Sequence, residues 1–382
     1  MSDLLPSFKH TSDIKLLMVV PKYPFPIVGG LEKQSHELSK SLIQNNIDVK
    51  VLSGKIFSSQ SDSEVVDGVK IYRVSWPKNQ LIRYFKLPFS LFFYLFRNRN
   101  CYNIVHVHTL GWFSLYVIIL SKILGKPVIT KLANVGDYGL PGVSKLFLGN
   151  LMIKILMLSE SLVSMSNEST HEAVDKGYAQ KNIFMTVNGI SLNTIVNNNN
   201  NNSLCKVVFV GRLHEQKDFT SLFKAWKLIQ ENSKVEAVLH IWGEGLLDVT
   251  LKSLVNELEI SKSVVFSGHV DNVDQKLHEM DVFVLPSFAE GNSNAILEGM
   301  AAGLPIVSTD VGGTVIQVGL EGKDFISKAG DTMTFYKNLL RLVENRSLRQ
   351  TVGLAMRIRI EEHFDIDKVS KDYIKAYQKI LS

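Results

Sequence analysis

Two glutamates, Glu290 and Glu298, stand eight residues apart and could together bind a polyhydroxy ligand. The apolar run Val282–Leu285 predicts a buried strand, residues 288–294 predict a polar loop, and Ala295–Ala302 predicts a helix. Eight steps of about 100° would leave the two carboxylates roughly 80° apart on one helix, so they would not share a face. With Glu290 in the loop and Glu298 on the first helical turns, both can still reach one elongated ligand.

The segment between the two glutamates could bind a phosphate. Gly303 and Pro305 end the predicted helix, and Ile306–Ser308 begins the next strand. A strand–loop–helix–strand unit of this length predicts a parallel crossover, and parallel sheets bind ligands beyond the carboxyl ends of their strands. A helix N-terminus offers unpaired N–H groups and the positive end of the helix dipole. The amides expected to face the ligand are those of Gly291, Asn292, Ser293 and Asn294.

Arg212 and Lys217 supply the opposite charge. Both follow the predicted strand Lys206–Val210, where a guanidinium fork and an ammonium point charge together suit a diphosphate. Gly243 follows the next predicted strand, Val238–Ile241, and allows a ligand to approach the backbone closely. The second half of the chain therefore predicts an anion site at the carboxyl edge of a parallel sheet.

Metal and nucleotide-cofactor chemistry receive little support from the motifs. The Asp365-Ile366-Asp367 triplet precedes a predicted tail helix and is interpreted as a cap rather than a magnesium site. The sequence has no G-x-x-x-x-G-K-[ST] loop, and no G-x-G-x-x-G opens the first crossover. A nucleoside triphosphatase and a nicotinamide dehydrogenase are therefore disfavoured, and a site without metal or bound cofactor is expected.

The motif that contains the two glutamates is long and specific. It reads E-G-x-x-N-x-x-x-E-x-M-A-x-G-x-P-x-V-x-T-D-x-G-G from Glu290 to Gly313, and it resembles the E-x7-E signature of the retaining glycosyltransferases of family 4. The resemblance covers nearly the whole chain and is strongest from Gly211 to Gly313. It implies the α/β GT-B fold, with two Rossmann-like domains whose parallel sheets face a central cleft.

The resemblance also implies a reaction, in which a sugar moves from a nucleoside diphosphate sugar to an acceptor hydroxyl with retention at the anomeric carbon. A UDP-sugar is the expected donor, and bacterial surface polysaccharide, lipopolysaccharide or capsule is the expected pathway. Arg212 and Lys217 would stabilise the diphosphate leaving group without a metal. Glu298 would bind the ribose hydroxyls and Glu290 the sugar hydroxyls, since ionised carboxylates accept hydrogen bonds.

The first half of the chain contributes fewer candidates. Ile14–Val20 predicts a buried strand, and Gly29 and Gly30 open the predicted helix Leu31–Gln44. The resemblance places this Gly-Gly pair beside the donor phosphates and the acceptor. It also identifies His108, at the end of the predicted strand Asn103–His108, as the active-site histidine beside the reacting sugar. Many family members carry a histidine near the position of Lys131, so its absence here leaves the acceptor chemistry open.

Length and composition predict two domains and a cytoplasmic protein. The chain has 382 residues, and its two cysteines suggest no disulfide framework. We expect an N-terminal domain over 1–190, an exposed Asn-rich linker over 191–203, a nucleotide-sugar-binding domain over 204–362, and a final helix over 363–382 that packs back on the first domain. Residues 1–13 lack the apolar core of a signal peptide, and no apolar run approaches the roughly 18 residues of a membrane span.

The charge distribution points to a membrane rather than to nucleic acid. Residues 1–202 hold 21 Lys and Arg against 13 Asp and Glu, while the whole chain carries +5. No nucleic-acid recognition motif accompanies this basic half. Leu81–Arg99 is rich in phenylalanine and has basic residues near its ends, so it is either a helix packed on the sheet or a segment that binds an anionic bilayer surface. Peripheral attachment to the cytoplasmic membrane is therefore expected as an alternative to burial.

Two other functions are compatible with the same residues. A nucleotide-sugar epimerase on the same fold would convert a single substrate without an acceptor. A catalytically silent module would bind a nucleotide sugar without cleaving it, although the set Arg212, Lys217, Glu290 and Glu298 argues for turnover. The expected partners are thus a nucleotide sugar, a glycan or lipid-linked acceptor and an anionic membrane surface, with no nucleic acid.

Overall fold

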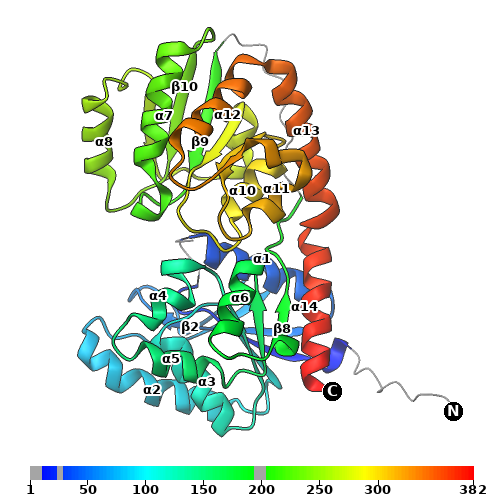
Figure 1. Cartoon of the computed structure of the whole chain (residues 1–382). Helices are drawn as coiled ribbons and strands as arrows, with labels where there is room; N and C mark the ends of the chain where they lie inside the picture. The colour runs from blue at the N-terminus through cyan, green and yellow to red at the C-terminus, as the bar shows by residue number, and fades with distance from the viewer. Residues whose placement is uncertain (1–10, 24–28, 193–203) are drawn as a thin grey trace, which may run out of the picture. The chain divides into compact units, whose positions relative to one another are not determined.

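The computed structural model describes residues 11–23, 29–192 and 204–382. The asparagine run and residues 193–203 of the expected linker lie outside the described residues. The chain divides into two compact units: unit 1 is Met1–Gly189 together with Ile366–Ser382, and unit 2 is Ile190–Asp365. Each unit is a Rossmann-like α/β domain with a mainly parallel sheet, so the predicted fold class is confirmed (Figure 1).

In unit 1, the described strands form one sheet in the order β3-β4-β2-β1-β5-β6-β7-β8. All neighbours pair in parallel except β3 and β4, which are antiparallel. The short edge strands β3 and β8 were not predicted, because neither carries a long apolar run. The bounds are β1 Lys15–Val19, β2 Asp48–Lys55, β3 Ser63–Val66, β4 Val69–Ser75, β5 Ile104–Val107, β6 Val128–Lys131, β7 Ser161–Ser164 and β8 Ile183–Met185.

Helices cover both faces of this sheet. Strand β1 shows why, since Leu16 and Met18 belong to one buried apolar cluster while Leu17 and Val19 belong to another. The first cluster packs under α1 and α14, and the second packs under α2, α3 and α5. The helices are α1 Gly30–Gln44, α2 Gln80–Arg97, α3 Trp112–Ile123, α4 Leu140–Ser144, α5 Gly149–Leu156, α6 Asn167–Asp175 and α14 Ile366–Leu381.

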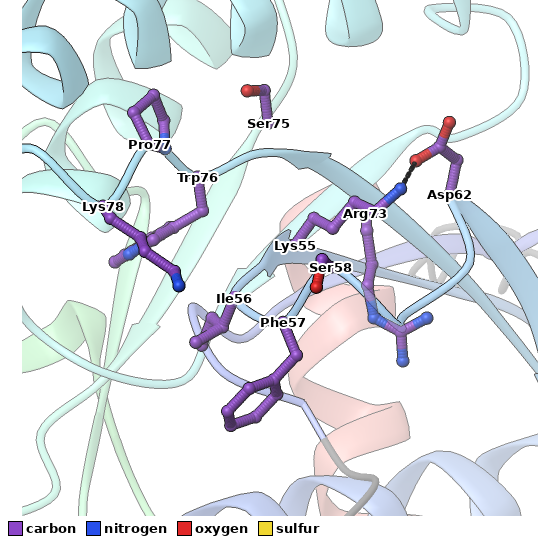
Figure 2. Close-up of a pocket in the computed structure, with 10 residues that line it drawn as sticks. All are labelled: Lys55, Ile56, Phe57, Ser58, Asp62, Arg73, Ser75, Trp76, Pro77 and Lys78. Carbon is purple, nitrogen blue, oxygen red and sulfur yellow. Dashed lines mark hydrogen bonds and ion pairs between the residues drawn. The ribbon is translucent and has the colours of Figure 1, made fainter.

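The loops that follow β2 and β4 border a surface cavity in unit 1 (Figure 2). The end of β2 contributes Lys55 and the loop after it contributes Phe57, while β4 contributes Arg73 and the segment after it contributes Trp76. Because β2 and β4 are parallel neighbours, their carboxyl ends lie at the same edge of the sheet. The cavity therefore lies at the edge where parallel sheets bind ligands.

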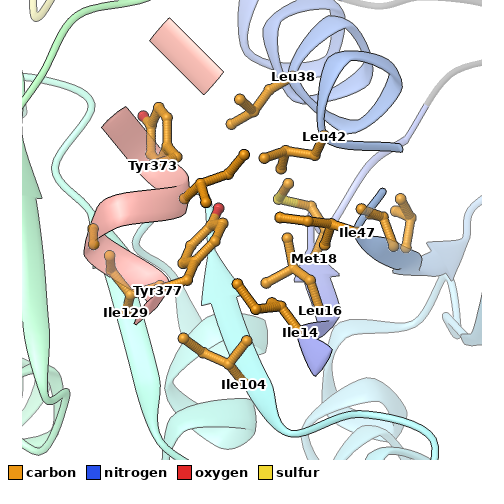
Figure 3. Close-up of a cluster of buried hydrophobic side chains, with 14 of the residues drawn as sticks. Ile14, Leu16, Met18, Leu38, Leu42, Ile47, Ile104, Ile129, Tyr373 and Tyr377 are labelled. Carbon is orange, nitrogen blue, oxygen red and sulfur yellow. The ribbon is translucent and has the colours of Figure 1, made fainter. Parts of the chain in front are cut away.

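Helix α14 completes unit 1 from the far end of the chain. Its apolar stripe, which includes Val369, Tyr373 and Tyr377, is buried against the sheet together with Leu38 and Leu42 of α1 (Figure 3). Ser41 of α1 donates a hydrogen bond to the Asp367 carboxylate at 2.7 Å. The second aspartate of the Asp365–Asp367 triplet thus binds a neighbouring helix of its own unit.

In unit 2, the described strands form a parallel sheet in the order β11-β10-β9-β12-β13-β14. The strands are β9 Cys205–Val210, β10 Ala237–Trp242, β11 Val264–Gly268, β12 Val282–Leu285, β13 Ile306–Thr309 and β14 Ile326–Ser327. The helices are α7 Phe219–Asn232, α8 Asp248–Glu257, α9 Val273–Lys276, α10 Asn294–Ala301, α11 Thr314–Gly322, α12 Thr332–Glu344 and α13 Arg346–His363.

Helix α2 has two apolar faces, which neither sequence interpretation anticipated. Leu87, Leu91 and Leu95 recur every four residues and are buried against the sheet. The phenylalanines face outward, with Phe85 73% exposed and Phe89 67% exposed. The interpretation of this segment as a helix packed on the sheet is therefore confirmed for the leucines. Burial of the phenylalanines in the same interface is wrong, because the leucines occupy it.

A second predicted helix is shorter and more exposed than expected. The apolar run Leu146–Leu158 by itself predicts a buried helix, but α5 begins only at Gly149 and Phe147 before it is 91% exposed. Leu148 adopts a left-handed backbone conformation with φ of 62°, which prevents the helix from beginning earlier. Within the three described stretches, none of the helices has the length and apolar character needed to cross a bilayer.

Candidate functional site

The sheet of unit 2 reverses its winding between β9 and β12. The chain adds β10 and β11 on one side of β9, then returns to place β12 and β13 on the other side. The carboxyl ends at such a reversal diverge into a crevice where α/β proteins bind their ligands. Arg212 and Lys217 follow β9, while Glu290 follows β12, so the fold places these three predicted site residues at the reversal.

Lys217 and Glu290 form an ion pair across the two loops. Both side chains are largely buried, and Ser287 donates a further hydrogen bond to the Glu290 carboxylate at 2.7 Å. Two donors on one oxygen fix the position of the carboxylate. Arg212 is exposed at the start of the loop that follows β9, which also carries Lys217. The predicted anion-binding pair is thus present, with one of its cations already bound to the predicted sugar-binding carboxylate.

Backbone contacts hold the two loops together. The Gln216 side chain donates to the Ala289 carbonyl, and the Phe288 amide donates to the Gln216 carbonyl at 2.8 Å. The sequence interpretation missed Gln216 and Ser287, because a polar residue in a loop does not reveal its tertiary partner. Their positions directly beside Lys217 and Glu290 were the available signal.

Glycines allow neighbouring loops of this site to touch. A Cβ atom on Gly243 would lie 1.9 Å from the Gly211 carbonyl oxygen, and one on Gly312 would lie 1.6 Å from the Glu290 carbonyl oxygen. Both glycines also have positive φ, of 147° and 53°. Gly312 in the motif is therefore required by the approach of the β13 loop to the Glu290 backbone.

Helix α10 carries the second glutamate. The helix begins at Asn294 rather than Ala295, and Glu298 is nearly buried on its second turn. The Ser293 amide donates to the buried Gln317 side chain at 3.0 Å, so this amide is already engaged. It is therefore not the free donor that the sequence interpretation expected, whereas Gly291 and Asn292 are buried in the loop beside Glu290.

The winding of unit 1 reverses in the same way, between β1 and β5. Gly29 is the N-cap of α1 in the β1 loop and Gly30 is the first helical residue. His108 follows β5, and its backbone amide donates to the Val19 carbonyl of β1 at 3.1 Å. Residues 24–28 of the first loop lie outside the described residues.

His108 belongs to a buried aromatic cluster. Its ring centre lies 4.2 Å from that of His106, which hydrogen-bonds the Tyr377 hydroxyl at 2.7 Å. Burial, with smaller effects from His106 and Lys131, holds the pKa of His108 well below its ordinary value. His108 is therefore a neutral imidazole at neutral pH. Neither of its ring nitrogens has a hydrogen-bond partner among the described residues.

Lys131 is the buried cation of unit 1. It ends β6, and its ammonium donates to the Asn188 side chain at 2.6 Å. Among the described residues it forms no ion pair with a carboxylate. Burial lowers the pKa of Lys131 to about 7. Asn188 thus has a structural role, because its side-chain oxygen accepts the hydrogen bond of the buried Lys131 ammonium. A buried charged group without such a partner would destabilise the fold.

The predicted site residues fall into two groups. Unit 2 brings Lys217 and Glu290 into contact and places its other seven candidates on the same sheet edge or on α10. These are Arg212, Gly243, Gly291, Asn292, Ser293, Asn294 and Glu298. Unit 1 carries Gly29, Gly30 and His108. In the described stretches, no group of three or more histidine, cysteine or acidic side chains is arranged to hold a metal ion.

Two family models match this chain. The model described as Glycosyltransferase Family 4 matches residues 28–194, and the model described as Glycosyl transferases group 1 matches residues 205–345. Among curated proteins, the chain is 25% identical over 255 residues to the capsular polysaccharide biosynthesis glycosyltransferase CapM of Staphylococcus aureus, a match that covers 62% of this chain and 66% of CapM.

A longer match relates the chain to the UDP-Gal:alpha-D-GlcNAc-diphosphoundecaprenol alpha-1,3-galactosyltransferase of Escherichia coli. The two are 25% identical over 373 residues, which is 91% of this chain and 94% of that enzyme. Among solved structures, Anabaena HepE in complex with UDP-glucose superposes with a TM-score of 0.77 at 15% identity, covering 96% of this chain and 99% of HepE. Sucrose-phosphate synthase from Thermosynechococcus elongatus gives 0.78 at 17% identity, covering 96% and 98%. These likenesses show that the fold is GT-B.

Proposed function

Since this chain belongs to the family 4 and group 1 glycosyltransferases, we propose that it moves a sugar from a UDP-sugar to an acceptor hydroxyl with retention of the anomeric configuration. The named activities of the Escherichia coli and Staphylococcus aureus relatives support a role in building a surface polysaccharide or capsule. The UDP-glucose complex of Anabaena HepE, which has the same fold, supports UDP as the nucleotide.

The observation that carries this proposal is the Lys217–Glu290 ion pair at the winding reversal of unit 2. A lysine ammonium has three N–H donors, so Lys217 can keep Glu290 and still donate to a diphosphate oxygen. Arg212, exposed in the same loop, adds a planar fork for the same anion. One cluster thereby binds the leaving group and orients a carboxylate toward the sugar attached to it.

The two glutamates have separate roles in this proposal. Glu290, held by Lys217 and Ser287, accepts hydrogen bonds from the hydroxyls of the transferred sugar. Glu298, on α10, accepts from the ribose hydroxyls. Neither carboxylate acts as a nucleophile. Charge that develops on the departing diphosphate is stabilised by Arg212, Lys217 and the N-terminal turn of α10, without a required metal ion.

His108 contributes from unit 1 as a neutral imidazole. A neutral ring has one N–H donor and one acceptor, so it can exchange hydrogen bonds with a sugar hydroxyl in either sense. Both nitrogens lack partners among the described residues, and a substrate hydroxyl would satisfy one of them. Gly29 and Gly30, at the start of α1, allow a ligand to approach the backbone at the same sheet edge.

The acceptor is proposed to be a lipid-linked saccharide met at an anionic membrane surface. Two curated relatives carry names that specify acceptors on diphosphoundecaprenol. The outward face of α2 supplies exposed phenylalanines, and Arg83, Lys86, Arg97 and Arg99 supply positive charge around them. Apolar and basic side chains on one amphipathic helix are the combination that binds anionic bilayers.

The function is tested by incubating the protein with a panel of UDP-sugars and lipid-linked acceptors and following the anomeric proton by NMR. We expect an acceptor-dependent product that keeps the donor's anomeric configuration, equal rates with and without EDTA, and a loss of roughly 10²–10³ in turnover for Arg212→Ala. Conversion of the donor without an acceptor would favour an epimerase, and an inverted product would contradict retention. Activity that EDTA abolishes and magnesium restores would contradict the metal-free leaving-group site.

A further inference from the structure

The surface cavity of unit 1 encloses about 530 Å³ beside the carboxyl ends of β2 and β4 (Figure 2). None of the predicted donor-site residues lines it. It combines three basic side chains with an aromatic and apolar wall, in one continuous lining formed by Lys55, Ile56, Phe57, Ser58, Asp62, Arg73, Ser75, Trp76, Pro77 and Lys78.

A buried arginine with unused hydrogen-bonding capacity lines this cavity. The Arg73 side chain is fully buried, donates to Glu64 and to the Ser61 carbonyl, and keeps its Nε without a partner among the described residues. A buried N–H left unpaired destabilises the fold, and more so on a charged group, so an acceptor is expected there when the site is filled.

Two lysines complete the positive charge of the cavity. Lys55 pairs with exposed Asp62 at 2.7 Å. Lys78 is exposed on the opposite side of the lining and forms no ion pair in the part of the chain that the structure describes. An exposed pair such as Lys55–Asp62 is weak, so Lys55 can turn to a stronger anion at little cost. The site therefore suits a group with more than one negative charge.

The aromatic wall is fixed by the backbone beneath it. The Trp76 ring lies against Gly54 of β2, where a Cβ atom would come within 2.3 Å of the ring. Phe113 contacts the same ring, with centroids 5.5 Å apart, and the Arg83 guanidinium lies 5.1 Å from its centre. Phe57 stands exposed across the cavity. A rigid apolar wall beside cationic groups is typical of a binding site for a ligand that is part apolar and part charged.

The lining runs directly into the exposed apolar helix face. Residue Asn79, which follows Lys78, caps the N-terminus of α2 by accepting from the Ile82 amide. The first outward side chains of α2, Leu81 and Phe85, are 71% and 73% exposed. If the charged head of a ligand lay in the cavity, an apolar chain attached to that head would therefore lie next to the exposed apolar side chains of α2.

We infer that this cavity binds the diphosphate and first sugar of a lipid-linked acceptor, with the lipid directed toward the outward face of α2. The diphosphate would accept from Lys55, Lys78 and the free Nε of Arg73, and the sugar would pack on the wall formed by Trp76 and Phe57. The inference rests on the proposed glycosyl transfer and specifies where the substrate other than the donor is recognised.

The test is a calorimetric titration of the full-length protein saturated with UDP, which occupies the donor site. The probe is N-acetylglucosamine diphosphate linked to a short, water-soluble alkyl chain, with inorganic pyrophosphate as a sugar-free comparison. Lys55→Met and Lys78→Met are each expected to weaken the probe about tenfold, the scale for one hydrogen bond to a charged group. Phe57→Ala should weaken the sugar-bearing probe and leave pyrophosphate unchanged.

The matched control is Lys70→Met, since Lys70 is an exposed lysine of β4 that does not line the cavity. Probe affinity equal to wild type in both Lys55→Met and Lys78→Met would overturn the inference. So would probe binding that disappears only in Arg212→Ala, because the probe would then occupy unit 2. Titration of UDP alone is a separate readout: its failure would count against the proposed donor site, while probe binding that the lysines control would still support the cavity.

Discussion

At the scale of single residues, Glu290 and Glu298 have different surroundings although the motif pairs them. Glu290 is held by Lys217 and Ser287, whereas Glu298 is buried on α10. Neutralising Glu290 would release Lys217 to donate more fully to a phosphate. Neutralising Glu298 would remove the carboxylate that is proposed to accept from the ribose hydroxyls.

We therefore predict opposite effects of the two amide substitutions on UDP binding. Glu298→Gln should weaken UDP about tenfold, and Glu290→Gln should leave UDP affinity equal to wild type or tighter while lowering transfer. Calorimetry with UDP measures both, with Glu231→Gln, an exposed glutamate of α7, as the control. Equal losses of UDP affinity in the two variants would mean that the assigned roles are wrong.

Lys131 makes the stability of unit 1 depend on pH. Its pKa falls to about 7 in the folded protein because of burial, against an ordinary value of 10.5. Between these two values the unfolded chain binds a proton that the folded chain does not, so stability rises with pH across that window. Below about pH 7 both states are protonated and the effect is constant.

Lys131→Met should accordingly flatten the alkaline side of the stability profile. In urea unfolding between pH 7 and 10, the free energy of unfolding of wild type should rise more steeply than that of the variant, by up to about 1.4 kcal/mol per pH unit. Loss of the hydrogen bond to Asn188 shifts the whole variant profile without changing its slope. Parallel profiles would show that Lys131 is not buried as a shifted amine.

At the scale of elements, the two faces of α2 have different roles. The buried leucines stabilise unit 1, and the exposed phenylalanines are proposed to bind a membrane surface. The substitutions Phe85→Ser, Phe89→Ser and Phe93→Ser together should lower sedimentation with anionic vesicles more than tenfold, because each removes an apolar group expected in the bilayer. Stability should change little, since these side chains are exposed.

Leu91→Ser is the matched control, because Leu91 is fully buried on the opposite face of the same helix. It should destabilise unit 1 by about 2–5 kcal/mol through loss of core packing. Comparison of anionic with neutral vesicles at low and high salt separates the contribution of the basic residues to vesicle binding from that of the aromatic residues. Equal vesicle binding by wild type and the triple phenylalanine variant would contradict a membrane role for α2.

The sequence predicted the elements that carry strong apolar periodicity and missed those that tertiary context decides. The central strands β1, β5, β9 and β12 were predicted within about two residues, because buried parallel strands are short apolar runs. The edge strands β3 and β14 carry no such run. The predicted start of the helix at residue 146 was wrong, because Leu148 adopts a left-handed backbone conformation. Its surroundings, and not its residue type, determine that conformation.

At the scale of the whole molecule, the sequence could predict which residue types lie at which sheet edge but not their partners. Lys217 and Glu290 are 73 positions apart, and only the pairing of β9 with β12 brings them together. The engagement of the Ser293 amide by Gln317 was equally hidden, since Gln317 belongs to a later helix. The local sequence predicts which polar and charged residues follow each strand. Contacts between residues that follow different strands can be predicted only once the order of the strands in the sheet is known.

Unit 1 is also interrupted in the sequence, since its last helix is made only after all of unit 2. A ribosome adding about 5–20 residues per second needs roughly 10–35 s to pass from Gly189 to Ile366. During that interval the nascent chain holds Leu38, Leu42 and His106 without the helix that covers them in the finished protein. Synthesis that stops before residue 366 therefore releases a chain whose second domain can be intact while its first carries an open apolar face, which chaperones and proteases recognise. The final helix makes completion of translation a condition for burying the first core.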